Sequence, residues 1–298
     1  MRPALLARPA PSTRWWKPGR WPRWLQLLVG GAAAWGLAVA VLLSTGDRYV
    51  AGAVVLGTFV VPLALGVRVA DGEVLPGVGT PLMVRLFAYG GLLGFLASAF
   101  LEHPMISQPA FVFDGWVGVV EEASKLAVLA YLTRHLVERT ARSGLVLGGL
   151  VGLGFTAFES AGYATASAIN SWGSSHAIIE MVVARALAAP FTHGLWTAVA
   201  GAALFASSRR GRYRAAPAAL AALAGVTALH AWWDLAPNVA ARLGGGDLAV
   251  YLVQATLSVP PLYAAYRIER CRGGADDGEA DRPAGVMQPD GVLDRSGR

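Results

Sequence analysis

Long apolar stretches alternate with short polar segments along most of the 298-residue chain. A helix needs about 20 mostly apolar residues to cross a bilayer. Eight stretches meet this length, and we place them at residues 24–45, 49–68, 82–103, 110–133, 144–169, 177–207, 215–237 and 247–267. The sixth is long enough to tilt or to run past the membrane surface. The pattern therefore predicts an all-α, polytopic membrane protein with about eight transmembrane helices.

The two ends of the chain are polar and flank this apolar region. Residues 1–23 form a basic arm, and we interpret the first span as an uncleaved helix because it has full length and lacks a good cleavage site. Residues 24–267 form one transmembrane domain. Residues 268–298 are polar and contain glycine and proline, which predicts a disordered tail.

The overall composition supports a membrane protein. Apolar residues make up 55% of the chain and charged residues 15%, whereas a soluble globular domain carries about 25% charged residues. The net charge of +6 does not indicate nucleic-acid binding, because the arginines stand in short clusters between apolar stretches. Cys271 is the only cysteine, which excludes an intramolecular disulfide and a multi-cysteine metal site.

The arginines also predict the orientation of the chain. With a cytoplasmic N-terminus, the inside segments hold the basic arm and then Arg68, Arg134, Arg139, Arg142, Arg209, Arg210, Arg212, Arg214, Arg267, Arg270 and Arg272. The outside segments hold only Arg48 and Arg242. Because basic loops stay on the cytoplasmic side, we expect both termini in the cytoplasm and a multi-pass protein embedded in the lipid of the inner (cytoplasmic) membrane.

Ionisable residues inside the spans are the main functional candidates, because one charge near the bilayer centre costs about 2.5–3.5 kcal/mol. Spans one, two and eight carry almost none, which suggests a jacket around an inner bundle. The set comprises Arg85, Glu102, Asp114, Glu121, Glu122, Lys125, Glu159, Glu180, Arg185, His193, His230 and Asp234. We expect Glu102, Asp114 and Glu180 to be solvated near the outer ends of their spans. The others predict a polar site among spans four to seven.

The fourth span carries the densest charge. Lys125 lies three residues after Glu122 and four after Glu121, so it can neutralise either carboxylate. The two adjacent glutamates point about 100° apart on a helix, which predicts two different roles. Taken alone, such a pair is equally consistent with an internal ion pair that ties helices together.

Four polar motifs follow one another on four consecutive spans. They are E-E-x-x-K at Glu121, Glu122 and Lys125, F-x-x-x-E at Phe155 and Glu159, the pair Arg185 and His193, and H-x-x-W-D at His230, Trp233 and Asp234. This ordered set resembles the PrsW-type intramembrane proteases, relatives of the glutamate-dependent CAAX prenyl endopeptidases. The resemblance covers residues 110–237. The CAAX branch has an arginine at the position of Leu126, which favours the PrsW branch and argues against a prenyl-protein substrate.

The resemblance implies an intramembrane endopeptidase that cuts a membrane-anchored protein. PrsW-type proteins resemble site-1 proteases, whose substrates include single-span regulators such as anti-sigma factors. Peptide hydrolysis needs an activated water, an oxyanion stabiliser and a proton donor. We expect Glu121 or Glu122 to be the general base, with His193 and His230 polarising the carbonyl or moving the proton. The expected supporting residues are Lys125, Phe155, Glu159, Arg185 and Asp234, the last of which would orient His230.

Two readings of metal use stay open. Glu122, Glu159, His193 and His230 suffice to hold a divalent ion such as zinc and to leave one position for water. However, the chain has no H-E-x-x-H motif, and the two histidines lie 37 residues apart on different spans. The resemblance is compatible with a metalloprotease and with a metal-free glutamate–histidine enzyme.

Two other functions also use intramembrane glutamate, histidine and lysine. One is an ion- or proton-coupled transporter, but a carrier would show internal repeats or paired broken helices, and the sequence indicates neither. The other is a non-catalytic scaffold that binds other membrane segments. The aspartyl-protease-like G-G-G-D at 244–247 and the serine-containing W-G-S-S-H at 172–176 lie in predicted loops, so we set both aside.

Overall fold

The computed structural model describes residues 21–71, 75, 77–209 and 211–280. Helix accounts for 84% of the structure, and the described residues contain no strand, so the predicted all-α class is confirmed. Residues 268–280 of the predicted disordered tail differ from the prediction, because they continue the last helix, which ends at Ala280. Residues 1–20 of the predicted arm and residues 281–298 of the predicted tail lie outside the described residues.

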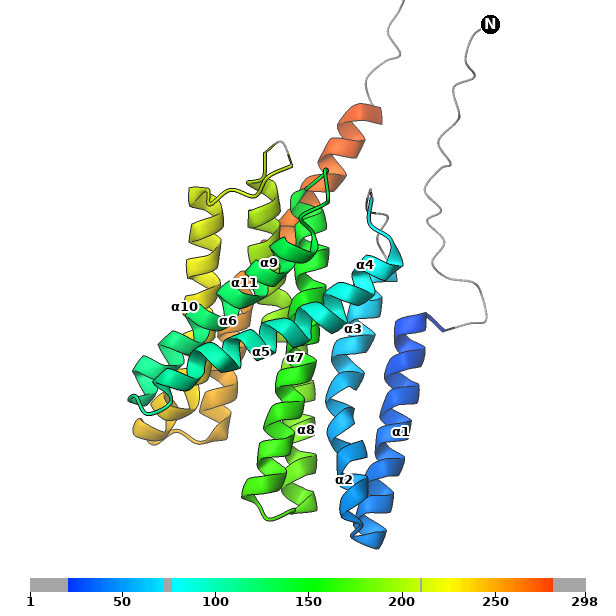
Figure 1. The fold of residues 1–298 in the computed structure, drawn as a ribbon, viewed down its shortest axis with the longest axis vertical. Helices are drawn as coiled ribbons and strands as arrows, with labels where there is room; N and C mark the ends of the chain where they lie inside the picture. Colours follow the sequence, from blue (N-terminus) through cyan, green and yellow to red (C-terminus); the bar gives the residue numbers. More distant parts are fainter. Residues whose placement is uncertain (1–20, 72–74, 76, 210, 281–298) are drawn as a thin grey trace, which may run out of the picture.

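The helices run mostly back and forth between two ends of the molecule (Figure 1). In chain order they are α1 (Arg23–Thr45), α2 (Arg48–Val55), α3 (Val60–Asp71), α4 (Thr80–Arg85), α5 (Gly91–Glu102), α6 (Ala110–Leu132), α7 (Ala141–Asn170), α8 (Ser175–Ala188), α9 (His193–Ala206), α10 (Pro217–Arg242) and α11 (Asp247–Ala280). Short 3₁₀ or π turns join several of them, at Leu56–Phe59, Leu86–Gly90, His103–Met105 and Ala189–Phe191. In Figure 1, α5 and α6 are strongly inclined to the more upright α1, α3 and α7.

Seven helical stretches in the described part of the chain are long and apolar enough to cross a membrane. They correspond to seven of the eight predicted spans. The remaining one, predicted at 110–133, is α6. Its 23 residues have the required length, but it carries four charged residues, Asp114, Glu121, Glu122 and Lys125, more than any other predicted span. A polytopic membrane protein is therefore confirmed, with its most highly charged helix among the predicted inner spans.

The sixth predicted span is not one continuous helix. It breaks after Ala188 into a 3₁₀ turn at Ala189–Phe191, and α9 then begins at His193. Pro190 explains the break, because proline lacks an N–H donor and its ring clashes with the preceding helical turn. The break places His193 at the first position of a helix.

The seventh span also differs at its end, because α10 continues through Pro237 to Arg242 instead of stopping near residue 237.

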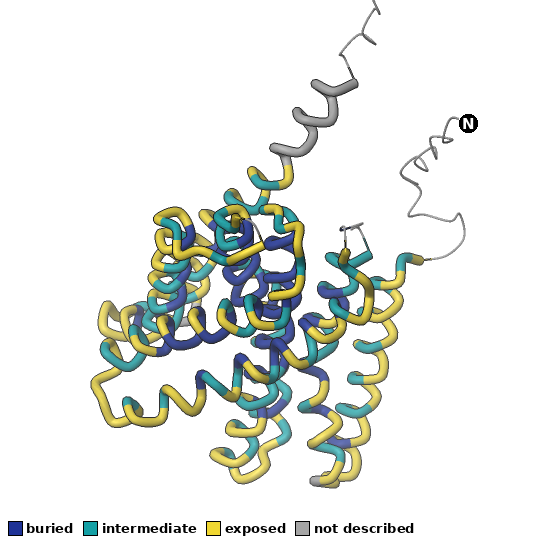
Figure 2. The backbone as a smooth tube through the Cα atoms, turned by 45° about the horizontal axis from the view of Figure 1, so that its top comes forward, coloured by how far each residue is buried: buried dark blue, intermediate teal, exposed yellow. Residues whose placement is uncertain are grey.

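The core of the bundle surrounds α7. Of the residues in its most apolar window, 89% are buried, compared with 6% for α1 and 11% for the span within α11. Figure 2 shows the buried residues gathered on the central helices, whereas the outer ones are mostly exposed. The first and eighth predicted spans are thus peripheral, as a jacket would be, whereas the second is 33% buried, more than the 17% of the seventh, and is not peripheral.

Three glycines spaced four residues apart let α7 approach α9 closely, as small residues do between membrane helices. They are Gly144, Gly148 and Gly152, and a side chain at each would collide with a carbonyl oxygen of α9, at Gly201, Thr197 and His193 respectively. This contact fixes the position of His193 relative to α7.

Candidate active site

The centre of the site is the side chain of Lys125 on α6. Its Nζ donates to Glu121 Oε2 at 3.0 Å and to Glu122 Oε1 at 2.8 Å. All three side chains are buried, and those of Glu122 and Lys125 are 0% exposed. The predicted pairing of the lysine with both glutamates is therefore present, and one turn of α6 presents all three groups to the interior.

His193 joins this group from the start of α9. Its Nδ1 lies 2.7 Å from Lys125 Nζ, and its Nε2 lies 3.0 Å from Glu159 Oε2. An ammonium group can only donate, so Nδ1 is the acceptor and the proton on Nε2 is donated to Glu159. Lys125 and Glu159 together define the tautomer of His193.

Glu159 on α7 is anchored by Arg185 near the end of α8. Arg185 Nη2 bonds the same carboxylate oxygen that faces His193, and Arg185 Nε donates to Ser160 Oγ at 3.0 Å. The guanidinium also lies 4.7 Å from the ring centre of Tyr163. Arg185 is thus held on three sides, and it fixes the carboxylate that orients His193.

His230 on α10 lies between two carboxylates. Its Nδ1 is 3.0 Å from Glu122 Oε1, and its Nε2 is 3.2 Å from Asp234 Oδ2. Neutral imidazole carries one N–H, so both contacts are hydrogen bonds only when the ring holds two protons or one carboxyl is protonated. Asp234 is the more exposed end of this chain, with 31% of its side chain accessible. The row Glu122–His230–Asp234 is a path along which a proton can move.

Aromatic side chains enclose the polar cluster. Lys125 Nζ lies 3.9 Å from the ring centre of Phe155, a distance at which an aromatic ring stabilises a cation. The rings of His193 and His230 are 4.9 Å apart. Trp196 packs against both of them, at 5.2 Å and 5.0 Å. Phe155 and Trp196 therefore form aromatic walls against the polar cluster.

Several buried polar atoms here have no hydrogen-bond partner among the described residues. They are Glu122 Oε2, Thr192 Oγ1, Trp196 Nε1 and Thr197 Oγ1. Leaving such a group unpaired costs about 1–3 kcal/mol, so each is available to a polar occupant of the site. Thr192, Trp196 and Thr197 belong to none of the four sequence motifs, and the signal for them in the sequence is their position beside His193.

Two further acids are less exposed than predicted. Glu102 at the end of α5 and Asp114 in the first turns of α6 are partly exposed, and one oxygen of each, Glu102 Oε1 and Asp114 Oδ2, is buried and lacks a partner among the described residues. Helices α5 and α6 pack against each other. Glu180 is exposed, as expected, with 72% of its side chain accessible.

The cluster has the composition of a metal site. Glu121, Glu122, His193 and His230 each offer one ligand atom, all within 4.8 Å of one another and all buried. Nitrogen and oxygen donors of this kind suit zinc, and the unpartnered Glu122 Oε2 is free to bind. The residues therefore fit a metal. Glu159, predicted as a ligand, is not in this group, and Glu121 takes its place.

The ammonium group of Lys125 already occupies contacts that the metal ion would need. Its Nζ lies within 3.0 Å of one atom each of Glu121, Glu122 and His193. The ammonium group thus binds three of the four ligand residues at once. A metal would have to displace it.

The fold and the site together define a polytopic membrane protein with a buried carboxylate–imidazole centre between its helices. The family model described as PrsW family intramembrane metalloprotease matches residues 79–264, and the chain belongs to that family. The protein is therefore a membrane protease, a hydrolase, and the predicted resemblance is confirmed. A search of the curated proteins and a search of the solved structures found no match.

Proposed function

We propose that this protease cleaves a membrane-anchored protein at the Glu121–Glu122–His193–His230 cluster, by attack of an activated water on the peptide carbonyl. The observation that carries the proposal is the convergence of these four buried side chains, from three helices, within 4.8 Å. A hydrolytic centre needs a base, a proton donor and donors for the oxyanion in one place. All three kinds of group are available here.

Glu122 is the general base in this proposal. Its Oε1 is held by Lys125 and His230, whereas its buried Oε2 has no partner among the described residues. A water bound to Oε2 would give its proton to that oxygen while it attacks the carbonyl carbon. Glu121 is the alternative base, but its Oε2 already accepts from Lys125.

His230 then delivers a proton to the leaving amine. It contacts Glu122 through Nδ1 and Asp234 through Nε2, so it can exchange protons with the base and be oriented by the aspartate. His193 is held by Lys125 and Glu159 beside the same centre. Both nitrogens of its ring are engaged in these contacts, so in this assignment the donor to the developing oxyanion is the unpartnered Trp196 N–H.

A divalent ion such as zinc, when bound, would polarise the scissile carbonyl or the attacking water. Glu121, Glu122, His193 and His230 would hold it, with Lys125 displaced from its present contacts. The lysine is thus the resident cation of the cluster in this structure.

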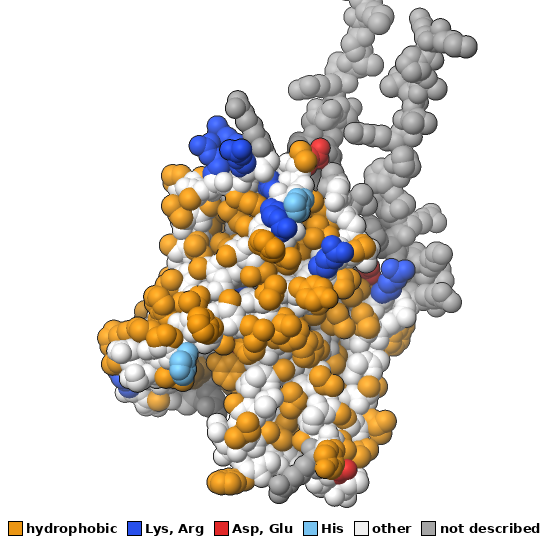
Figure 3. Space-filling view, viewed as in Figure 1, with side chains coloured by type: hydrophobic (Ala, Val, Ile, Leu, Met, Phe, Trp, Pro, Cys, Tyr) orange, Lys and Arg blue, Asp and Glu red, His pale blue; other side chains and the backbone are white. Residues whose placement is uncertain are grey.

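We further propose that the substrate is a single-span regulator such as an anti-sigma factor, cut near the outer side of the inner membrane. This proposal rests on the family resemblance and on the predicted orientation. In Figure 3 most basic side chains lie towards the upper end, above a broad hydrophobic band. In Figure 1 α11 ends at the upper end of the molecule, and α1 begins at its own upper end and runs downwards. This asymmetry supports cytoplasmic termini.

The assignment of the base is tested by comparing Glu122→Gln with Glu121→Gln in purified protein acting on a single-span substrate. Loss of a general base lowers a rate by about 10²–10⁴-fold. We expect the larger loss for Glu122→Gln. A larger loss for Glu121→Gln would move the base to Glu121, and wild-type rates in both variants would refute the proposed mechanism.

A further inference from the structure

We propose that Tyr163 of α7 binds the main chain of the substrate beside the scissile bond, with its hydroxyl donating a hydrogen bond to a substrate carbonyl oxygen. This inference rests on the proposed function, because it adds a substrate-binding residue to the same proteolytic centre. Tyr163 belongs to none of the four sequence motifs. Its role follows from its place one helical turn beyond Glu159 and from its contacts.

Tyr163 continues the stripe of α7 that lines the buried cluster. Phe155, Glu159 and Tyr163 follow one another at intervals of four residues, so their side chains lie along one face of the helix. The exposed fraction along this stripe rises from 0% at Phe155 to 8% at Glu159 and 48% at Tyr163. Tyr163 therefore stands where this face of α7 passes from the buried centre to the surface.

Two other helices change from buried to exposed in the same direction. On α10, Asp234 is partly exposed one turn beyond the buried His230. On α6, Asp114 is partly exposed two turns before the buried Glu121. The α7–α8 and α10–α11 connections both lie towards the lower end of the molecule in Figure 1, so these residues are on the side of the cluster that faces that end. We call Asp114, Tyr163 and Asp234 the rim of the site. A peptide that approaches from that end meets the rim before it reaches the cluster.

The ring of Tyr163 is held by Arg185 from α8. The guanidinium of Arg185 lies 4.7 Å from the ring centre, and the same group bonds Glu159 and Ser160. A cation over an aromatic face is stabilising at this distance. Tyr163 is thus placed by a residue that is itself anchored in the site, which reduces the side-chain freedom that substrate binding would have to remove.

The hydroxyl of Tyr163 forms no hydrogen bond within the described part of the chain. It is nevertheless close enough to the carboxylates of Glu159, Asp234 and Glu121 to interact with them electrostatically. These carboxylates come from three different helices around the site. The hydroxyl therefore borders the space over the cluster where a bound peptide would lie.

The chemistry of the rim explains why a donor is needed there. Ionised Asp114 and Asp234 can only accept hydrogen bonds, so they suit the N–H groups of a substrate. A substrate carbonyl oxygen instead requires a donor, and Arg185 is already bound to Glu159 and Ser160. The Tyr163 hydroxyl is the uncommitted donor of the rim. Because every peptide unit has a carbonyl oxygen, this contact does not depend on the side chains of the substrate.

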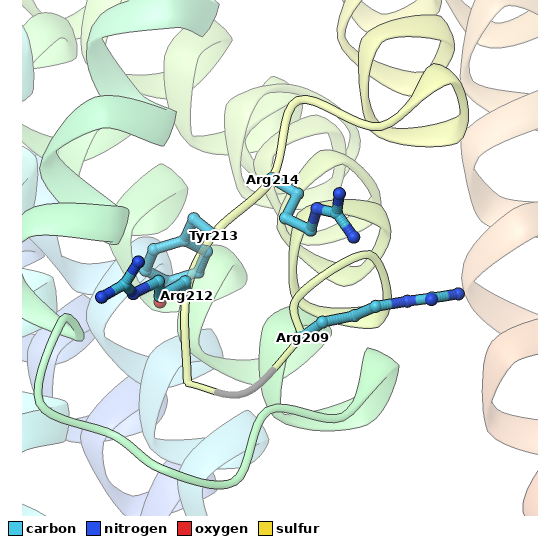
Figure 4. Close-up of a pocket in the computed structure, with 4 residues that line it drawn as sticks. All are labelled: Arg209, Arg212, Tyr213 and Arg214. Atoms are coloured by element: carbon cyan, nitrogen blue, oxygen red, sulfur yellow. The ribbon is translucent and has the colours of Figure 1, made fainter.

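Two other tyrosines that stack on arginines do not share this arrangement. Tyr213, which Figure 4 shows on the loop before α10, stacks on Arg139, but its hydroxyl pairs with that of Thr133. Tyr131 stacks on Arg134 at 4.1 Å and is 60% exposed. It lies next to the last residue of α6, at the opposite end of that helix from the rim. Tyr131 is therefore a matched control for Tyr163.

The test measures binding and cleavage separately, with full-length protein in nanodiscs and a single-span substrate. Loss of one neutral hydrogen bond weakens binding about 2- to 12-fold. Tyr163→Phe keeps the ring and its contact with Arg185 and removes only the hydroxyl. We expect it to raise the Kd of the substrate by this factor in the Glu122→Gln background, where binding is measured without cleavage. In the otherwise unchanged protein, KM should rise by the same factor while kcat stays constant, because the contact is made equally in the ground state and the transition state.

Tyr131→Phe removes the same hydroxyl from the control tyrosine and should leave Kd and KM at their wild-type values. An unchanged Kd in Tyr163→Phe, or an equal loss in Tyr131→Phe, would overturn the inference. A loss that occurs in Tyr163→Ala but not in Tyr163→Phe would also overturn it, by showing that only the ring matters. The loss should be the same for substrates that differ in the residues on either side of the cut, and a loss confined to one substrate side chain would refute the main-chain contact. Failure of the proposed function has a different signature, because Glu122→Gln would then cleave at the wild-type rate whichever residue stands at position 163.

Discussion

Replacing Lys125 with methionine separates a catalytic from a purely structural role for the buried charge cluster. Methionine is close in length but neutral, so the variant loses the contacts of Nζ with Glu121, Glu122 and His193 at 2.7–3.0 Å. Removing one partner of a buried ion pair costs about 3–5 kcal/mol, a large part of the roughly 5–15 kcal/mol that stabilises a typical folded protein. We expect a less stable protein that still folds.

The rate should fall more than this stability loss explains. Without Lys125, the Glu122 carboxylate and the His193 tautomer are no longer fixed, so we expect a loss of about 10²–10⁴-fold per folded molecule, the usual contribution of acid–base catalysis. The assay is cleavage of a single-span substrate by purified protein, normalised to the folded fraction from a thermal melt.

The matched control is Leu129→Ala, one turn further along α6 and 0% exposed. A buried leucine truncated to alanine costs about 2–5 kcal/mol, a comparable destabilisation without any loss of charge. We expect this control to keep its rate per folded molecule. If Lys125→Met also kept the wild-type rate per folded molecule, the catalytic role assigned to the cluster would be wrong. Zinc binding followed by calorimetry should tighten in Lys125→Met, because the competing ammonium is gone.

Two further changes test the scaffold and the orientation. Gly152→Ala would place a methyl group against the carbonyl oxygen of His193, so we expect a loss of about 1–3 kcal/mol from overpacking together with reduced cleavage. Gly225→Ala meets nothing within 4 Å and should be neutral or stabilising by up to about 1 kcal/mol; equal melting shifts in the two variants would contradict the tight α7–α9 contact. Reporter fusions after Arg214 and after Asn170 should read inside and outside respectively, and the reverse pattern would invert the proposed topology.

Most elements of the site are readable from the sequence because three of the four motifs fall within a single helix; only Arg185 and His193 lie on two helices, α8 and α9. Glu121, Glu122 and Lys125 must meet at helical spacing, and so must His230 and Asp234. The packing partners were not readable in this way. Which carboxylate faces which imidazole depends on how α7 and α9 cross, and the glycines that permit this close crossing carry no charge or motif.

The predictions for the sixth span and for two acidic residues differ from the structure for local reasons. The sixth predicted span was treated as one helix because its hydropathy is continuous, yet Pro190 divides it just before His193. Glu102 and Asp114 were expected in solvent because they lie near span ends, whereas the inclined packing of α5 on α6 buries one oxygen of each. Hydropathy reports the length of a span but not its tilt or the direction in which a terminal side chain points.

The most direct measurement is mass spectrometry of a single-span membrane substrate incubated with the purified full-length protein. The account predicts one pair of new peptide termini at a site in or beside the span. It predicts their loss in Glu122→Gln, and their retention in Glu180→Gln, a matched change of an exposed glutamate on α8. Cleavage that persists at the wild-type rate in Glu122→Gln would contradict the claim that the buried cluster is the proteolytic centre.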